Sequence, residues 1–155
     1  MQLRRVLAAT AVPLVGAVVW ASGAWSTSDG STGDRRVHCS TDTLRGTYLF
    51  AFDGQVIQAG RQHPVAVAGR EYFDGEGHVR GIFSFSVNGD VSRRVHQAGR
   101  YTVRSNCTGS GSYAASGDRW DMFIDPDGSN LTFVQTSKGF VASGTESRAT
   151  HKRIG

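Results

Sequence analysis

Hydrophobic and polar residues alternate along most of the chain after Cys39, a pattern that predicts β-strands. Side chains of a strand point alternately to opposite faces, so such runs indicate strands with one buried face. Outside the N-terminal segment, no stretch keeps the spacing of an amphipathic helix over a useful length. Glycine-containing turns separate the alternating runs, which span residues 46–52, 65–73, 79–87, 99–103, 120–124, 131–135 and 140–148.

The runs predict seven or eight short antiparallel strands, arranged as a sandwich or as a small closed barrel. Asn88-Gly89 is the strongest hairpin signal, because both residues tolerate the positive φ of a tight turn. A barrel of eight strands encloses a space that side chains fill or that holds one small ligand. Glycines within or at the start of the strands favour the barrel, since sharp coiling requires them: Gly46, Gly69, Gly81, Gly99 and Gly144.

The N-terminal segment predicts an export signal. The pair Arg4-Arg5 precedes an apolar stretch at 6–19, and small residues at 22–24 offer a cleavage site. A transmembrane anchor is the alternative, but Pro13 and Gly16 interrupt the stretch, which is shorter than the roughly 20 apolar residues of a span. We therefore expect a secreted or otherwise extracytoplasmic protein without a membrane span in its mature form. The predicted parts are a signal peptide (1–24), a flexible leader (25–38), one β-barrel domain (39–150) and a tail (151–155).

The two cysteines, Cys39 and Cys107, both lie after the predicted cleavage site. In an exported chain they predict one disulfide, with two separate buried thiols as the alternative. The bridge would enclose most of the barrel and hold the N-terminal segment against a late strand. A loop of this length would stabilise the fold by about 4 kcal/mol in chain-entropy terms.

Charge and histidine spacing argue against two classes of partner. The formal net charge is +4, and loss of Arg4-Arg5 leaves 15 of the 17 basic residues against 13 acidic ones. Charges of both signs are interspersed, so we expect no nucleic-acid partner. The five histidines show no zinc-binding spacing, and no motif indicates another metal or a cofactor.

Large side chains on one face of the alternating runs would line the interior of the barrel. They are the candidates for contact with a small hydrophobic molecule, because ligand pockets combine apolar walls with a few polar groups. For Tyr48 and Tyr101 the alternative is ordinary filling of the barrel. The candidate binding residues are Tyr48, Phe50, Phe52, Phe73, Phe83, Phe85, Tyr101, Trp120, Met122, Phe133 and Gln135.

Glu71 is the candidate catalytic residue, because it is in phase with Val67 and Phe73 in the run VAVAGREYFDGEG. If those two residues face a core, the carboxyl faces it too. Burial raises the pKa of a carboxyl, which makes it a proton donor or acceptor near neutral pH. Two alternatives remain: an ion pair with an arginine, of which Arg148 is one candidate, or a register that turns Glu71 outward.

Several short motifs together resemble a group of exported bacterial β-barrel proteins that is similar to the allene oxide cyclase barrel, within the calycin-like architectures. The match covers roughly residues 39–148, and it departs from the group's pattern at Arg70-Glu71, where small or apolar residues are usual. The motifs are Cys39, LRGTYLF (44–50), FDGEGHV (73–79), GRYTV (99–103), NCTG (106–109) and SGT (143–145).

The resemblance implies mainly a fold, an all-β, eight-stranded antiparallel barrel of the allene oxide cyclase type. Related barrels include cyclases that close rings in polyene or oxylipin substrates without a cofactor, and dirigent proteins that steer coupling. We therefore expect a secreted barrel that encloses a small hydrophobic molecule, as a cofactor-independent cyclase or isomerase acting on a polyene, polyketide or oxylipin-like substrate. The alternative is a non-catalytic carrier or a cell-surface interaction module. Dimers and trimers both occur among such barrels, so a homo-oligomer is compatible with the sequence.

Overall fold

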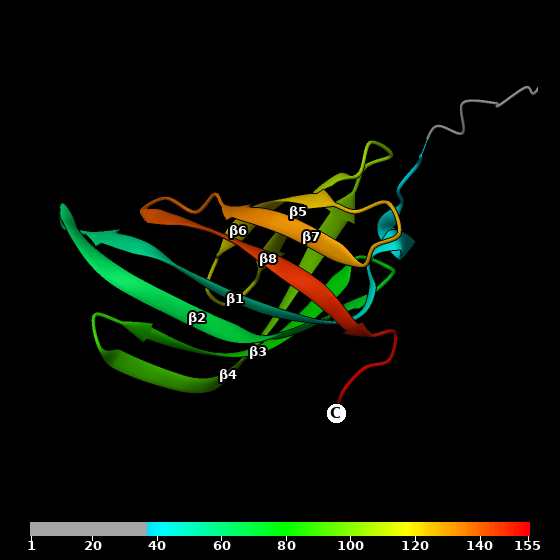
Figure 1. Cartoon of the computed structure of the whole chain (residues 1–155). Helices are drawn as coiled ribbons and strands as arrows, with labels where there is room; N and C mark the ends of the chain where they lie inside the picture. Colours follow the sequence, from blue (N-terminus) through cyan, green and yellow to red (C-terminus); the bar gives the residue numbers. More distant parts are fainter. Residues whose placement is uncertain (1–36) are drawn as a thin grey trace, which may run out of the picture. The chain divides into compact units, whose positions relative to one another are not determined.

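Each strand of the structure pairs with the next along the chain in antiparallel fashion, and the last strand pairs with the first (Figure 1). The computed structural model describes residues 37–155, so the predicted signal peptide and all but the last residues of the predicted leader lie outside the described residues. The elements are the short 3₁₀ helix η1 (Thr41–Thr43) and the strands β1 (Arg45–Gln58), β2 (Arg61–Asp74), β3 (His78–Val87), β4 (Asp90–Val103), β5 (Thr108–Tyr113), β6 (Arg119–Ile124), β7 (Asn130–Gln135) and β8 (Phe140–Thr150).

The closed barrel of eight antiparallel strands confirms the predicted fold class. Asn88 and Gly89 both have positive φ, 51° and 95°, as expected for the tight turn between β3 and β4. Several strands are longer than the alternation predicts, most of all β4, which begins at Asp90.

Strand β5 is the element that the hydrophobic pattern does not predict. Its sequence, TGSGSY, lacks the large apolar residues that mark the other strands. Gly109 and Gly111 nevertheless face the interior, where the side chains of Met122 and Trp120 occupy the space beside them. A Cβ at Gly111 would overlap the Trp120 ring, so the small residues of β5 allow large residues of β6 to pack across the barrel.

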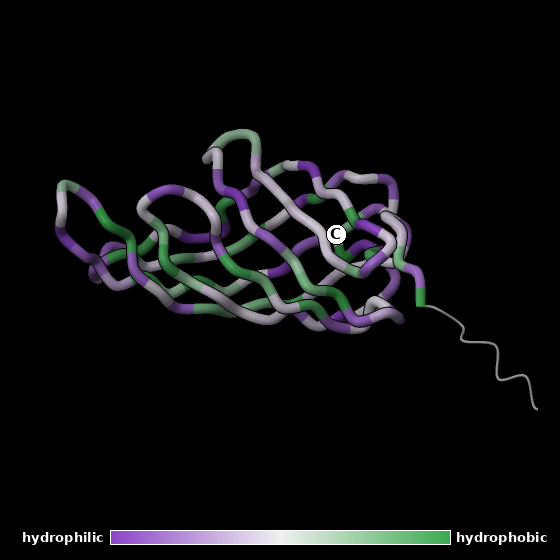
Figure 2. The backbone as a smooth tube through the Cα atoms, turned by 90° about the horizontal axis from the view of Figure 1, so that it is seen from above, coloured by the Kyte–Doolittle hydropathy of each residue, from purple (hydrophilic) through white to green (hydrophobic). Residues whose placement is uncertain are grey.

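The inward side chains of the alternating strands fill the interior of the barrel. Figure 2 shows hydrophobic and hydrophilic segments interspersed along the strands. In one half of the barrel the interior is solid, with Tyr48, Phe73 and Met122 fully buried. Edge-to-face contacts join the Phe73 ring to those of Tyr48 and Tyr101, at centroid distances of 5.3 and 4.9 Å. This half is the main hydrophobic core of the protein.

The solid half is closed at its end by the segment that leads into β1. Helix η1 is followed by Leu44, which is fully buried. The Tyr101 hydroxyl donates to the Leu44 carbonyl oxygen at 2.8 Å and accepts from the Gly75 N–H at 2.9 Å. The Tyr48 hydroxyl donates to the Gly128 carbonyl oxygen at 2.5 Å. These two tyrosines therefore hold together the turns at the closed end.

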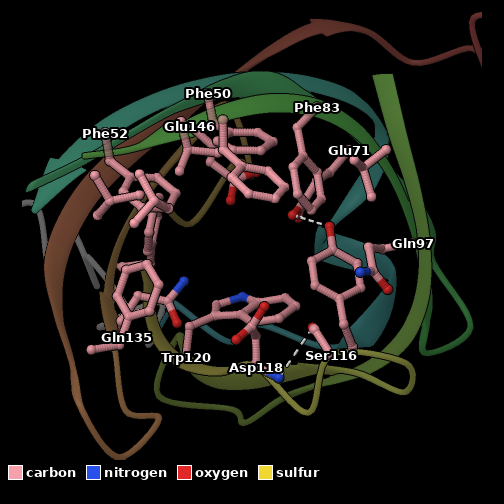
Figure 3. Close-up of a pocket in the computed structure, with 18 residues that line it drawn as sticks. Phe50, Phe52, Glu71, Phe83, Gln97, Ser116, Asp118, Trp120, Gln135 and Glu146 are labelled. Carbon is pink, nitrogen blue, oxygen red and sulfur yellow. Dashed lines mark hydrogen bonds between the residues drawn. The ribbon is translucent and has the colours of Figure 1, made fainter. Parts of the chain in front are cut away.

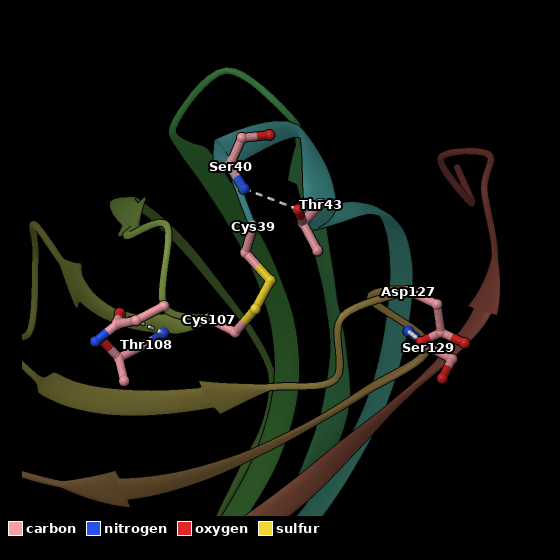
Figure 4. The surroundings of a disulfide bond; sticks show 8 residues. Cys39, Ser40, Thr43, Cys107, Thr108, Asp127 and Ser129 are labelled. Carbon is pink, nitrogen blue, oxygen red and sulfur yellow. Dashed lines mark hydrogen bonds between the residues drawn. A yellow bond between two sulfur atoms is a disulfide. The ribbon is translucent and has the colours of Figure 1, made fainter. Parts of the chain in front are cut away.

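Cys39 and Cys107 form the predicted disulfide, which joins the segment before η1 to the turn between β4 and β5 (Figure 4). The Cys39 N–H also donates to the Ser105 carbonyl oxygen at 3.2 Å. The bridged residues are 68 positions apart, and the loop encloses β1 to β4. These four strands are the longer part of the barrel, so the bridge encloses most of it, as expected. Cys107 itself does not lie in a late strand, because it precedes β5.

Candidate functional site

The other half of the barrel is hollow, with a cavity of about 230 Å³ (Figure 3). Its wall is mostly aromatic and aliphatic, and it includes rings from β1, β3, β6, β7 and β8. An apolar cavity of about 150 Å³ is large enough to hold benzene, so this one has room for a somewhat larger molecule. The lining side chains are Phe50, Phe52, Val65, Val67, Glu71, Phe83, Phe85, Val87, Val95, Gln97, Tyr113, Ser116, Asp118, Trp120, Phe133, Gln135, Phe140 and Glu146.

Glu71 faces this cavity from β2, and only 4% of its surface is exposed. Its inward direction follows from the alternation, since Val67 and Phe73 on the same strand are also buried. The Tyr113 hydroxyl donates a hydrogen bond to Glu71 Oε1 (Figure 3, dashed). Burial raises the pKa of Glu71 to about 7, while the hydrogen bond from Tyr113 partly opposes that shift by stabilising the carboxylate. The Glu71 carboxyl therefore keeps its proton to a higher pH than an ordinary glutamate does.

Gly81 creates the space in which Tyr113 reaches Glu71. Gly81 lies directly opposite Glu71 in the β2–β3 register. A Cβ at this position would occupy the place of the Tyr113 hydroxyl. Burial and the neighbouring carboxyl raise the pKa of Tyr113, so its hydroxyl keeps its proton and remains a donor.

Glu146 is a second buried carboxyl in the same cavity, with 3% of its surface exposed. Strand β1 lies between β2 and β8, where Tyr48 is opposite Glu71 and Phe50 is opposite Glu146. The two glutamates therefore flank neighbouring inward positions of β1, although they belong to strands far apart in the sequence. Burial, and to a lesser degree the charge of Glu71, raises the pKa of Glu146 well above that of an ordinary glutamate.

Five buried polar atoms have no hydrogen-bond partner in the described part of the chain, and all five belong to side chains that line this cavity. Buried polar groups are nearly always paired, so a cluster of unpaired ones indicates a place built to hold a polar group of a ligand or water. The atoms are Glu71 Oε2, Gln97 Oε1, Trp120 Nε1, Gln135 Oε1 and Glu146 Oε2.

The predicted binding residues divide between the two halves of the barrel. Tyr48, Phe73, Tyr101 and Met122 belong to the solid core and do not reach the cavity, because they lie toward the closed end. These four side chains are thus placed in the core and not on the cavity wall, and for Tyr48 and Tyr101 this is the arrangement expected from the filling alternative. The predicted residues that do line the cavity are Phe50, Phe52, Phe83, Phe85, Trp120, Phe133 and Gln135.

Arg148, one candidate partner for Glu71, lies at the closed end. It donates to the Arg45 and Asp127 carbonyl oxygens and stands over the Tyr48 ring at 5.6 Å. Within residues 37–155 neither Glu71 nor Glu146 has a salt-bridge partner. The outward register for Glu71 is likewise contradicted by its burial.

Sequence reasoning missed the two residues that accompany Glu71. The alternation that places Glu71 in the interior could also have identified Glu146, because Glu146 is in phase with Phe140, Ala142 and Gly144 on a predicted strand. Tyr113 carried no such signal, since it ends the glycine- and serine-rich strand β5. Among the described residues, no group of three or more His, Cys, Asp or Glu side chains is arranged to hold a metal ion.

Comparison with known proteins does not place the chain in a family. No protein-family model matches the chain, and no curated protein matches it. Among solved structures, the chain is similar to a redesigned β-barrel, mFAP1, bound to DFHBI. The similarity covers 73% of this chain and 99% of the mFAP1 chain, with 18% sequence identity and a TM-score of 0.45. The resemblance to the allene oxide cyclase barrel therefore stays a prediction from sequence motifs.

Proposed function

We propose that the hollow half of the barrel binds a small, mostly hydrophobic molecule that carries at least one polar group. The observation behind this proposal is the set of five unpaired buried polar atoms in an otherwise aromatic and aliphatic wall. An apolar wall supplies affinity through desolvation, and a few fixed polar atoms orient the ligand. A barrel meant only to be stable would fill this half with side chains, as it does the other half.

A cavity-filling substitution tests this proposal. Val95 lines the cavity from β4, whereas Val91 on the same strand is 55% exposed. We expect Val95→Trp to abolish binding of small aromatic molecules, measured by calorimetry, and Val91→Trp to leave it unchanged. Equal binding by both variants would mean that the ligands do not enter the barrel.

Acid–base catalysis is the second candidate function, and the buried carboxyl of Glu71 on the cavity wall favours it. Its Oε1 accepts from Tyr113, while Oε2 is buried and has no hydrogen-bond partner in residues 37–155. With a pKa of about 7, the group can remove a proton from a bound molecule and return it elsewhere. Such a transfer needs no cofactor and suits an isomerase or cyclase, in keeping with the resemblance to ring-closing barrels.

A β,γ-unsaturated cyclohexenone tests the catalytic function directly. Its isomerisation moves one proton from the α to the γ carbon and produces a conjugated enone that absorbs in the ultraviolet. We expect the protein to accelerate this conversion and Glu71→Gln to abolish the acceleration, because the amide cannot accept the proton. Binding without any acceleration would favour the carrier over the isomerase.

For location, we propose that the barrel works outside the cytoplasm, with 1–24 as a cleaved signal. The disulfide supports this, because such bridges persist in oxidising compartments. In residues 37–155 the structure contains no helix long and apolar enough to cross a membrane. N-terminal sequencing of the exported protein would test the cleavage site.

A further inference from the structure

Among residues 37–155, the side chains that line the cavity include acidic groups and no basic ones. Glu71, Asp118 and Glu146 line it, whereas no lysine or arginine of residues 37–155 does so. The protein as a whole carries more basic than acidic residues, so this segregation is opposite in sign to the overall composition. A positive charge inside the cavity would have to come from the ligand.

Buried carboxyls without a cationic partner are rare, because an ionised carboxylate that leaves water loses its hydration. Glu71 and Glu146 are both almost fully buried, and neither has a salt bridge within residues 37–155. A ligand ammonium group placed between them would supply the missing counter-charge. Because both carboxyls are almost fully buried, such a pair interacts more strongly than it would at the protein surface.

The remaining wall suits a cation as well. Four of the five unpaired atoms are oxygens, and oxygens of this kind accept the N–H bonds of an ammonium group. The faces of aromatic rings attract cations, and eight of the lining side chains are aromatic. These rings are Phe50, Phe52, Phe83, Phe85, Tyr113, Trp120, Phe133 and Phe140.

From this arrangement we propose that the cavity selects a hydrophobic organic cation, a small aromatic or alicyclic amine, over neutral and anionic molecules of the same shape. The proposal rests on the proposed ligand-binding function and deepens it. It disfavours the carboxylate-bearing oxylipins among the predicted ligands, because their charge would face Glu71 and Glu146. The positive charge that develops in a ring closure would be stabilised by the same groups.

Binding of a cation must be coupled to loss of a proton. The titratable groups on the cavity wall are Glu71 from β2, Tyr113 from β5, Asp118 from the loop after it and Glu146 from β8. Strands β1, β3, β4, β6 and β7 contribute only apolar, amide and indole side chains to that wall. An ammonium group stabilises the carboxylate form, so below neutral pH its binding displaces a proton from a glutamate.

Three matched probes test the proposal on the mature protein by calorimetry at pH 7.5: phenethylamine, phenethyl alcohol and hydrocinnamic acid. We expect phenethylamine to bind at least tenfold more tightly than the alcohol and hydrocinnamate not to bind measurably. The affinity for the amine should fall as the pH is lowered to 5, and the measured heat should vary with the buffer because protons are released. The affinity for the alcohol should change little over this range.

Variants separate the charge preference from binding itself. The double variant Glu71→Gln/Glu146→Gln should lose the preference for the amine and still bind the alcohol, while Asp121→Asn, an exposed acid on β6, should behave as the wild type. If the alcohol or hydrocinnamate binds as tightly as the amine, the cation preference is wrong and the hydrophobic site remains. If none of the three binds, the proposed ligand-binding function fails with it. The wild-type comparison decides the question even if the double variant does not fold.

Discussion

The Tyr113 hydroxyl donates a hydrogen bond to Glu71 Oε1, across the interior of the barrel and between residues 42 positions apart. The carboxyl is thereby fixed by one oxygen, while the other has no hydrogen-bond partner within residues 37–155. A group held in this way can act on a ligand from a defined position, which a freely rotating carboxyl cannot. The position of the Glu71 carboxyl on β2 therefore depends on Tyr113, the last residue of β5.

Replacing Tyr113 by Phe should weaken the folded state and raise the pKa of Glu71 further. The substitution removes the donor that stabilises the carboxylate. We expect the free energy of unfolding at pH 8 to fall by about 1–3 kcal/mol, the usual cost of an unpaired buried group. Urea denaturation measures the stability, and NMR titration of labelled glutamate carboxyls measures the pKa.

Tyr72→Phe is the matched control, because Tyr72 lies next to Glu71 in the sequence but points to the opposite face of β2. It should change the stability by less than about 0.5 kcal/mol. An unshifted Glu71 pKa in Tyr113→Phe would contradict the role assigned to the hydroxyl.

Gly81→Ala should disrupt the same hydrogen bond although neither Tyr113 nor Glu71 is itself replaced. Its Cβ would take the place of the Tyr113 hydroxyl, so the ring must move away from Glu71. We expect the destabilisation of Gly81→Ala to be smaller in the Tyr113→Phe background, because that background has no hydroxyl to displace. A double-mutant cycle of unfolding free energies measures this coupling, and strict additivity would show that Gly81 does not act through Tyr113.

The protein should become less stable as the pH rises from about 4.5 through 7. The pKa of Glu71 is higher in the folded state, about 7, than the ordinary 4.5, and that of Glu146 is also raised. The folded protein therefore holds these protons more tightly than the unfolded chain. The resulting stability is complete below the unfolded pKa and is lost as the pH rises through the folded one. For Glu71 the shift corresponds to roughly 3 kcal/mol.

Unfolding free energies measured in urea at several pH values test this dependence. Glu71→Gln should flatten the curve between pH 4.5 and 8, and the double variant with Glu146→Gln should flatten it further. Asp74 and Asp127 have lowered pKa values, so their contributions change at more acidic pH and do not mask the effect. A wild-type stability that rises over this window would contradict the buried, proton-holding state of the two glutamates.

Tyr101→Phe should lower stability without changing ligand binding. Its hydroxyl connects Leu44 to the turn after β2 and does not line the cavity. We expect a loss of about 1–3 kcal/mol in the free energy of unfolding, because two buried backbone groups lose their partner. Phe85 lies on the cavity wall, so Phe85→Ala should lower the ligand affinity, which calorimetry measures. Weaker ligand binding in Tyr101→Phe would restore the predicted role of this residue in the site.

Removal of the disulfide should likewise affect stability and spare the cavity. The loop between Cys39 and Cys107 spans 68 positions, which corresponds to about 4 kcal/mol in the chain-entropy model. The bridge joins the segment before η1 to the β4–β5 turn, and neither lines the cavity. In Cys39→Ser/Cys107→Ser we expect a lower unfolding temperature and an unchanged ligand affinity at 15 °C. A large loss of affinity in the folded variant would show that the closed end controls the cavity.

The sequence by itself determined which side of each strong strand faces inward. Alternation is a local property, so Glu71 could be placed in the interior from its phase with Val67 and Phe73 alone. The same reasoning would have found Glu146 on the last strand. Because only two cysteines are present, the sequence also determined which residues an intramolecular disulfide would join, and the structure shows that they are bonded.

Only the tertiary structure decided which inward residues meet a cavity and which form the solid core. That division depends on the stagger of strands that pair across the closed barrel, and alternation within one strand carries no information on it. Tyr48 and Phe50 stand on the same face of β1, yet one supports the closed end and the other lines the cavity. The tertiary structure also decided which residues lie near Glu71. Closure of the barrel places β8, which carries Glu146, beside β1. The small residues of β5 and Gly81 leave the space in which Tyr113 reaches the carboxyl.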